Sequence, residues 1–453
     1  MTTATRVPGP PGLPLIGSLL DLKRDALATY LAARRDHGDV VRLWAGPPGL
    51  RVEVYMVFSP EGAQQVLAAD SANFRKDNVF YGEIRQSFGN GLLTSQDEDY
   101  LRQRRLVQPL FTRRRVDNYA EAIAVEADSL VERWAKLPDG QVEAADEMSR
   151  FALRTVARIL FGQDVEQAVE TVHTSFPVLG SFVRGRGMSP VRLPREWPLP
   201  GHREALEAER RLYAVCDEII ARRAADGAAE GGEDLLSLLT EARDEDGTRL
   251  DATELREQVL IFLLAGHETT ATSLTFALHL LGKHPEQQRL AREEADRVLG
   301  GGRRPTAEDY PKLPYLTQVL KEAMRLFPAA PSIGRRAVKA TVIGGVEIPA
   351  GADVLVSPYV TQRHPAHWED PERFDPERFT PEREAQRHRY AWFPFGGGPR
   401  ACIGQHFSML ESVLALGVLL REFEVEAIDQ EVPLGQGITL ETHGPVRLRL
   451  TRR

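Results

Sequence analysis

The longest regular pattern in the chain is a run of apolar residues at helical spacing from Leu255 to Leu281. Asp251 and Glu254, three residues apart, match a capping box, which marks where this helix begins. His284-Pro285 ends the pattern, because proline cannot continue a helix. A helix of about 30 residues is about 45 Å long, so the pattern predicts one helix that crosses the whole molecule.

Shorter patterns predict further helices and a smaller amount of sheet. Helical spacing recurs over residues 403–423 and dominates residues 118–223, and Ser59-Pro60-Glu61 begins another helix that runs toward Ala69. Strands are expected at Asp39–Ala45 and Arg51–Phe58, around Val338–Ile348, at Val354–Val356 and in a terminal hairpin over Val432–Leu450.

Two stretches interrupt this regular pattern. Phe74–Asn90 has the pattern of an irregular segment that contains several apolar residues. After Leu179, the glycine-rich Arg184-Gly185-Arg186-Gly187 and the proline-rich Pro190–Pro200 break the helical pattern, which indicates a flexible connection.

Length and charge narrow the function classes. The chain has 453 residues, above the roughly 250 to 300 residues that one core usually supports, so two domains would be the default, yet no convincing linker is found. The formal net charge of −8 argues against general nucleic-acid binding. Between Tyr100 and Val116 lie six arginines and no acidic residue, a run that usually means a solvated helix face.

The sequence also gives no sign of a membrane anchor. No stretch reaches the roughly 18 apolar residues needed to cross a bilayer, and a proline-rich segment over residues 1–14 stands where a signal sequence would lie. The chain contains two cysteines, which fits a reducing cytoplasm. We therefore expect a cytoplasmic protein.

The stretch from Phe393 to Gly404 holds the strongest candidate for chemistry. Its three consecutive glycines, bounded by prolines, favour a tight loop, and Cys402 follows at the N-terminus of a predicted helix. The positive end of that helix and the nearby Arg400 are expected to favour a thiolate, which is a nucleophile or a metal ligand. Cys216, in an apolar helical pattern, is interpreted as a small buried hydrophobic residue.

A second candidate lies in the middle of the long helix, at Ala265-Gly266-His267-Glu268-Thr269-Thr270. Gly266 costs about 1 kcal/mol of helix stability relative to alanine, and Glu268 interrupts an apolar run, so the segment breaks local rules as functional sites do. Ile261, Ala265 and Thr269 share one helical face. A lone helical threonine is more often simply bonded to the preceding turn, and His267 is given no role.

The pattern Phe395-Gly396-x-Gly398-x-Arg400-x-Cys402-x-Gly404 closely resembles the haem-binding loop of the cytochrome P450 family. Three other family motifs occur in the family's order: Ala265–Thr270, Glu322-x-x-Arg325 and Asp370–Phe379. The resemblance implies a mainly α fold with a smaller β part, formed by residues 1–453 as a single domain of the soluble bacterial type. The haem would lie between the long central helix and the cysteine-loop helix.

The resemblance also implies which residues hold the cofactor, haem b. Cys402 would be the axial thiolate ligand of the iron, a ligand that in this family favours O–O cleavage. Burying the two haem propionates requires cationic partners, for which Arg335 competes with Arg336. Tyr100 stands where family members usually have tryptophan or histidine. The expected cofactor contacts are Tyr100, Arg104, Ala265, Arg335, Phe395, Arg400, Cys402 and Gly404.

Other roles are carried over in the same way. Glu268 and Thr269 would relay protons to dioxygen, whereas Glu322, Arg325 and Arg378 would form a structural network that holds the cysteine loop. The residues expected to contact substrate are Phe80, Tyr81, Ile84, Phe88, Phe182, Ile261, Ala265, Ala330, Ile333, Ile438 and Thr439.

The function implied is a haem-thiolate monooxygenase that inserts one oxygen atom of O₂ into a hydrophobic small molecule, in natural-product or lipid metabolism. A terpenoid, a fatty acyl chain and a polyketide are all compatible with an apolar pocket. Electrons would come from NAD(P)H through a reductase and a separate ferredoxin or flavodoxin. The arginines of residues 102–115 would help this redox protein to dock. The enzyme is expected to be a monomer. The alternative is a non-oxygenating haem-thiolate ligand or gas sensor, or a peroxide-rearranging enzyme, and the retained acid and threonine argue against both.

Overall fold

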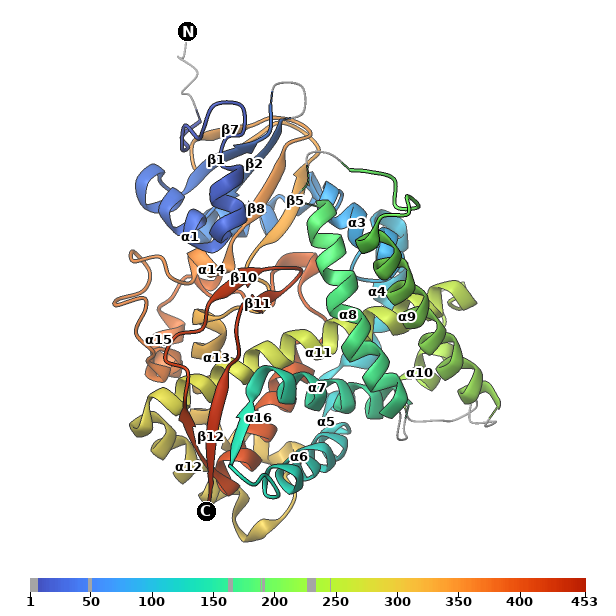
Figure 1. Ribbon diagram of the computed structural model, residues 1–453, viewed down its shortest axis with the longest axis vertical. Coiled ribbons are helices and arrows are strands. Elements are labelled where there is room, and N and C mark those ends of the chain that lie inside the picture. The colour runs from blue at the N-terminus through green and yellow to red at the C-terminus, as the bar shows by residue number, and fades with distance from the viewer. Residues whose placement is uncertain are drawn as a thin grey trace.

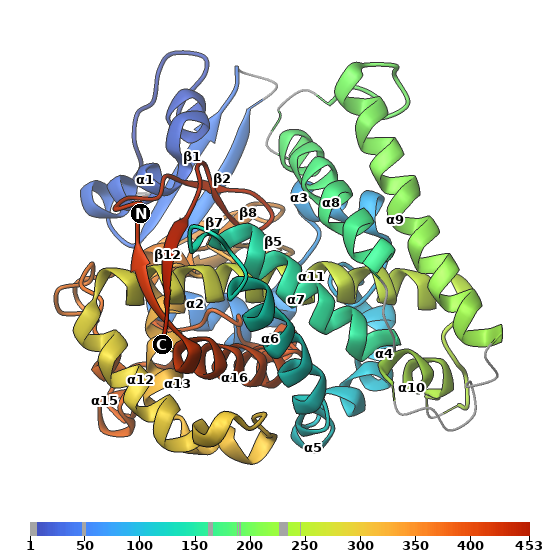
Figure 2. The same cartoon turned by 60° about the horizontal axis from the view of Figure 1, so that its bottom comes forward.

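Helix α11 (Ala252–Lys283) crosses the whole molecule in both ribbon views (Figures 1 and 2). The computed structural model describes residues 7–47, 51–161, 166–187, 189, 192–225, 234–244 and 246–453. The predicted capping box between Asp251 and Glu254 is confirmed, and the helix ends before Pro285. Contrary to the sequence-based expectation, α11 is long and apolar enough to span a membrane, but 72% of its most apolar window is buried inside the protein, as in a core helix.

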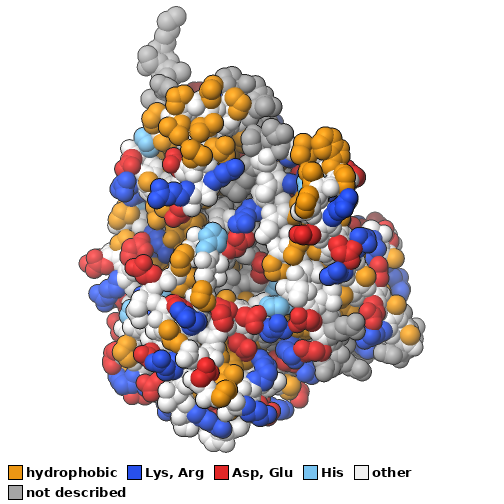
Figure 3. Space-filling model, viewed as in Figure 1, with side chains coloured by type: hydrophobic (Ala, Val, Ile, Leu, Met, Phe, Trp, Pro, Cys, Tyr) orange, Lys and Arg blue, Asp and Glu red, His pale blue; other side chains and the backbone are white. Residues whose placement is uncertain are grey.

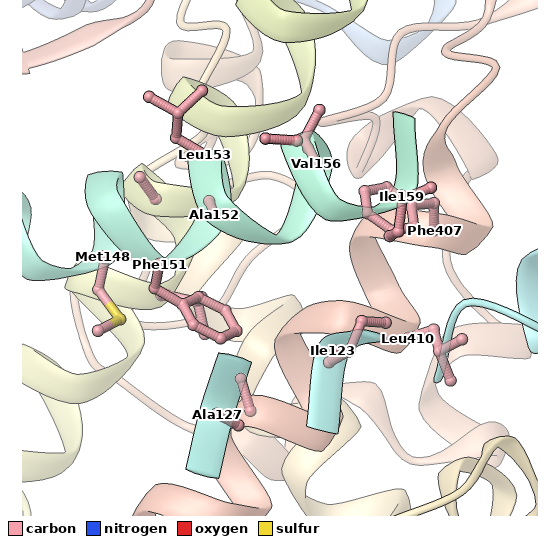
Figure 4. Packing of buried hydrophobic residues seen from close by; sticks show 14 of the residues in the cluster. Ile123, Ala127, Met148, Phe151, Ala152, Leu153, Val156, Ile159, Phe407 and Leu410 are labelled. Carbon is pink, nitrogen blue, oxygen red and sulfur yellow. The ribbon is translucent and has the colours of Figure 1, made fainter. Parts of the chain in front are cut away.

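One helix packs closely against the middle of α11. Helix α7 (Ala144–Phe161) approaches it at Gly266, where a Cβ would lie 2.7 Å from the Val156 side chain. This close approach explains why a helix-weakening glycine stands in a core helix. On its other side α7 packs against α6 (Ala120–Trp134) and α16 (Gln405–Glu422), with residues such as Phe151 and Phe407 filling the interface (Figure 4).

The other helices surround this centre. Their bounds are α1 Leu19–His37, α2 Pro60–Gln64, α3 Val79–Phe88, α4 Asp97–Val107, α5 Arg113–Asp117, α8 Glu166–Gly187, α9 Pro200–Ala225, α10 Leu235–Glu241, α12 Pro285–Leu299, α13 Pro314–Leu326, α14 Pro358–Thr361 and α15 Pro381–Ala385.

Four small sheets are described, and the largest joins distant parts of the chain. Its strand order is β1-β2-β8-β5-β3. Strand β2 of the N-terminal hairpin pairs in parallel with β8, which lies more than 290 residues later in the sequence, and Val57 lies beside Val356. The strands are β1 Val40–Ala45, β2 Val52–Val57, β3 Phe74–Arg75, β4 Gln141–Glu143, β5 Ile333–Ala337, β6 Thr341–Ile343, β7 Val346–Ile348, β8 Asp353–Val356, β9 Phe423–Ala427, β10 Leu434–Gln436, β11 Leu440–Thr442 and β12 Arg447–Arg452.

Three local expectations were wrong. Phe74–Asn90 is not irregular, because it forms β3 and then α3, which Asn78 caps by accepting a hydrogen bond from the Tyr81 N–H. The expected break over Arg184–Gly187 is wrong, since α8 continues to Gly187, but the break over the described residues 192–199 of the proline-rich stretch is confirmed. The terminal hairpin is shorter than expected, because β10 pairs with β11 whereas β12 pairs with β4 and β9.

Candidate functional site

The loop before Cys402 is a tight turn that requires glycine at two positions. Gly396 and Gly398 have φ angles of 70° and 64°, a conformation that residues with a Cβ rarely adopt. A Cβ on Gly398 would also lie 1.9 Å from the carbonyl oxygen of Leu67, so the loop presses directly on a neighbouring segment. The Cys402 N–H donates to the carbonyl oxygen of Phe395 at 2.9 Å and closes the loop.

Cys402 has an accessible side chain although protein surrounds it, and it stands just before α16. Burial raises the pKa of its thiol, while the Gly404 N–H and the charges of Arg104 and Lys76 act in the opposite direction. The expectation that the helix end and a nearby arginine would favour the thiolate is therefore wrong for the free thiol. Coordination to a metal ion deprotonates a thiol outright.

Tyr100 and Arg104 lie on one face of α4 and both bind the backbone of the cysteine loop. The Tyr100 hydroxyl donates to the carbonyl oxygen of Pro399 at 2.6 Å, and Arg104 donates to that of Ala401 at 3.1 Å. The guanidinium of Arg400 lies 3.4 Å from the centre of the Tyr100 ring. The structure thus brings together Tyr100, Arg104 and Arg400, three of the residues expected to contact the cofactor.

Two further cations beside this loop are almost fully buried. Lys76 is 9% exposed and donates to the carbonyl oxygen of Leu93 at 3.1 Å, and Arg335 is 4% exposed and donates to that of Gly334 at 2.7 Å. Burial, followed by the nearby Arg335 and Arg400, holds the pKa of Lys76 well below its usual range. Sequence reasoning missed Lys76, because a lysine at the end of a short strand carries no motif.

Within the described part of the chain, no carboxylate forms an ion pair with Lys76, Arg335 or Arg400. Arg336, in contrast, pairs with Asp353 at 2.9 Å, which leaves Arg335 as the better partner for an outside anion. Buried cations without a counter-charge are unfavourable. The site is therefore built for an anionic ligand, and a group with two carboxylates next to an accessible thiol fits it.

The second candidate segment is the middle of α11. Thr269 donates from its hydroxyl to the Ala265 carbonyl oxygen at 2.8 Å, the back-bonded geometry that a helical threonine often adopts. Burial raises the pKa of Glu268 to about 7, and a hydrogen bond from the Thr439 hydroxyl at 2.7 Å acts in the opposite direction. His267 points into the core, where burial lowers its pKa to about 4.

A cavity of about 780 Å³ opens beside Ala265 and Thr269 and runs toward α1 and the β10–β11 hairpin. Figure 3 shows this face hollowed near its middle, with charged side chains of both signs around the hollow. Eight of the residues expected to contact substrate line the cavity: Phe80, Tyr81, Ile84, Ala265, Ala330, Ile333, Ile438 and Thr439.

Three of the expected substrate contacts lie elsewhere. Phe88 is fully buried against Phe176, with ring centres 5.7 Å apart, and Ile261 is buried in the core cluster. Phe182 packs edge-on against His202, with ring centres 5.1 Å apart. Sequence reasoning missed Leu264, which lines the cavity and lies four residues before Glu268, a spacing that could have indicated it.

Glu322 and Arg325 form a completely buried ion pair on α13. Both side chains are 0% exposed, and the arginine donates to the two carboxylate oxygens at 2.6 and 2.8 Å. Arg378 lies 3.3 Å from the same carboxylate. Gln362, which no motif indicated, accepts from the Phe393 N–H at 2.9 Å and donates to the carbonyl oxygens at the end of α13, so it links this pair to the cysteine loop.

The comparison with known families decides what this arrangement is. A sequence model described as cytochrome P450 matches residues 7–441. The chain belongs to the cytochrome P450 family. It is 36% identical to cyclooctatin synthase of Streptomyces melanosporofaciens, over 97% of this chain and 94% of that protein. It is 35% identical to pentalenene oxygenase of Streptomyces avermitilis, over 97% of this chain and 96% of that protein.

The structural comparison agrees. A crystal structure of the heme domain of cytochrome P450DA matches with a TM-score of 0.89 and 29% identity, over 99% of this chain and 98% of that one. The predicted mainly α fold with a smaller β part is thereby confirmed. This P450 is a monooxygenase, and the family uses haem b, O₂ and electrons from NAD(P)H through redox partners.

Proposed function

We propose that this P450 inserts one oxygen atom into a terpenoid-like hydrocarbon. The observation that carries the proposal is the cavity of about 780 Å³ beside Ala265 and Thr269, with side chains such as Phe80, Ile333 and Ile438 in its wall. Two relatives that align with nearly the whole chain are named cyclooctatin synthase and pentalenene oxygenase. These names favour a terpenoid over the fatty acyl chain and the polyketide.

The residues around the cysteine loop would hold the haem. Cys402 supplies the iron ligand, and Arg335, Arg400 and Lys76 supply positive charge for the two propionates, for which the described residues offer no competing carboxylate. Phe395 and Gly404 shape the backbone around the thiol. When bound, the haem supplies the oxygen-activating redox chemistry.

Glu268 and Thr269 would handle protons on the substrate side. With a pKa of about 7, the Glu268 carboxyl can both hold a proton and release one near neutral pH. Both side chains line the cavity. The Thr269 hydroxyl can exchange its hydrogen bond to the Ala265 carbonyl oxygen for one to a bound ligand. We expect Thr269→Ala to retain haem and substrate but to divert electrons into hydrogen peroxide or water. Fully coupled turnover in that variant would remove Thr269 from the mechanism.

We further propose that a separate ferredoxin or flavodoxin delivers the electrons to a monomeric enzyme. The arginines at the start of α5 are exposed, and α5 packs against α16, the helix that follows Cys402. Arg102 does not belong to this surface, because it pairs with Glu254. Arg113→Glu should slow reduction by an acidic partner and weaken its salt dependence. Reduction unchanged by salt and by this substitution would contradict the docking surface.

A screen of hydrophobic compounds tests the proposed substrate class. Binders are recognised by the shift they cause in the ferric spin state, and each binder is then incubated with NADPH, O₂ and surrogate redox proteins. We expect terpenoid hydrocarbons to bind and to yield oxygenated product. Spin-state shifts and products with fatty acids alone would refute the substrate class, and binding without NADPH-dependent product would favour the non-oxygenating alternative.

A further inference from the structure

The tip of the β10–β11 hairpin contacts two of the helices that line the cavity, α8 and α11. Ile438 approaches α8 at Gly180, where its Cδ1 atom lies 4.0 Å from the position a Cβ would occupy. One residue later, Thr439 reaches α11 and donates its hydroxyl hydrogen to Oε2 of Glu268 at 2.7 Å. A three-residue turn therefore connects two elements that are not neighbours in the sequence.

A second contact fixes the hairpin to α8. Arg184 donates to Oε2 of Glu441 at 2.6 Å, and both side chains are only about one-third exposed. The Glu441 side chain folds back over Gly437, where a Cβ would lie 1.9 Å from its Oε1 atom. Glycine at this position allows the carboxylate to reach Arg184 across the turn. Arg184 belongs to the stretch that the sequence marked as a break, yet it is helical.

We propose that Thr439 is a positioning residue for Glu268, and that the Arg184–Glu441 ion pair anchors the hairpin so that Thr439 stays in place. The inference rests on the proposed proton-handling role of Glu268. The hydroxyl fixes one carboxylate oxygen and leaves the other free to exchange a proton inside the cavity. The anchor makes this arrangement depend on where α8 lies relative to the hairpin.

The groups around Glu268 have opposing effects on its pKa. Burial raises the pKa of Glu268, the Thr439 hydrogen bond lowers it, and the Glu441 carboxylate raises it. Arg184 on α8 and His443, 3.9 Å from Glu441, are further charged or titratable groups beside the hairpin. Among the described residues, the cavity is also lined by Lys23, Arg24, Asp25, Arg192 and Asp353. Because the hydroxyl stabilises the ionised form, its loss should raise the pKa of Glu268.

The test measures the protonation of Glu268 directly, by infrared difference spectroscopy of the holoenzyme as a function of pH. Glu268→Gln identifies the carboxyl band by removing it. We expect Thr439→Val, which has nearly the same shape, to raise the pKa of Glu268 by about one pH unit, because a hydrogen bond to a charged group is lost. Thr439→Ser keeps the hydroxyl and should restore the original value.

The anchor is tested with the double variant Arg184→Gln/Glu441→Gln, made both with Thr439 present and together with Thr439→Val. Loss of the Glu441 carboxylate by itself lowers the pKa of Glu268, so the anchoring effect is the difference between the two backgrounds. We expect removal of the pair to shift the pKa of Glu268 further upward when Thr439 is present than in Thr439→Val, where the hydroxyl is already lost. Equal shifts in the two backgrounds would overturn the anchoring role of the ion pair.

Two further outcomes separate this inference from the proposed function. An unchanged pKa in Thr439→Val, or a Thr439→Ser variant that behaves like Thr439→Val, would overturn the positioning role. Coupling of electrons to product that is unaffected by Glu268→Gln would refute the proton-handling role of Glu268. The infrared titration of the carboxyl would still decide whether Thr439 sets its pKa.

Discussion

The buried Glu322–Arg325 pair gives a sharp stability prediction, because the chain contains a matched exposed pair. Glu286 and Arg289 have the same three-residue helical spacing, with an N···O distance of 2.7 Å, but their side chains are 65% and 45% exposed. The pair on α13 is 0% exposed on both sides. The two pairs therefore differ in burial and in their further partners, because Arg289 also pairs with Glu293 whereas Glu322 also binds Arg378 and the Asp375 N–H.

Among the described residues, Glu322→Ala leaves the buried Arg325 guanidinium with the carbonyl oxygens of Gln362, Pro371 and Arg373 as its hydrogen-bond partners, over the Trp368 ring. Breaking a buried pair in this way lowers the free energy of unfolding by about 3 to 5 kcal/mol. Glu286→Ala should cause no measurable loss, because exposed pairs are screened by water and salt. Urea unfolding followed by circular dichroism, with midpoint and slope fitted for each variant, measures both effects.

A double variant, Glu322→Ala/Arg325→Met, completes the test. It removes the stranded charge, so we expect it to be more stable than Glu322→Ala alone. Equal losses in Glu322→Ala and Glu286→Ala would refute the reasoning. Arg325→Met is also measured alone. A double variant whose loss equals the sum of the losses in Glu322→Ala and Arg325→Met would likewise refute the reasoning, because the coupling between the partners would then be absent.

Three further predictions concern buried titratable groups. Burial lowers the pKa of His267 to about 4 in the folded protein, so unfolding takes up a proton and the free energy of unfolding should fall as pH drops from about 6.5 to about 4. His267→Gln should flatten this loss in acid-unfolding curves, and an unchanged slope would contradict the prediction. Lys76→Met should stabilise the haem-free protein but release haem faster to a haem acceptor, and slower or equal release would exclude Lys76 as a propionate partner. Burial raises the pKa of Glu411 far above its usual range, so stability should decline as pH rises above about 4, and Glu411→Gln should remove this decline between pH 5 and 8; a decline of the same size in the variant would argue that Glu411 is not responsible.

Features set by neighbouring residues were predictable from the sequence. The capping box at Asp251 and the proline after Lys283 define α11 by local chemistry alone, so both ends of the helix were found. The α3 helix was missed although its cap, Asn78, is local, because Gly82 and scattered aromatic residues hid the helical spacing. The end of α8 was missed because Arg184 and Arg186 are held by Glu441 and Glu83, partners far away in the sequence.

The same distinction holds for the site. Cys402, Glu322 and Arg325 belong to compact motifs and were found, and the structure places them around one loop. Lys76 and Gln362 have no motif, because their importance comes only from the buried surroundings that folding creates. The pKa of Cys402 was misjudged for a related reason: the helix end can be seen in the sequence, whereas burial, the larger effect, cannot.

The central claim is that the sulfur of Cys402 ligates a haem iron. Absorbance of the purified, reduced protein under carbon monoxide tests it most directly. We predict the red-shifted Soret band of a thiolate-ligated haem, and its loss in Cys402→Ala. Absence of that band from the unmodified protein, or its persistence in Cys402→Ala, would contradict the account.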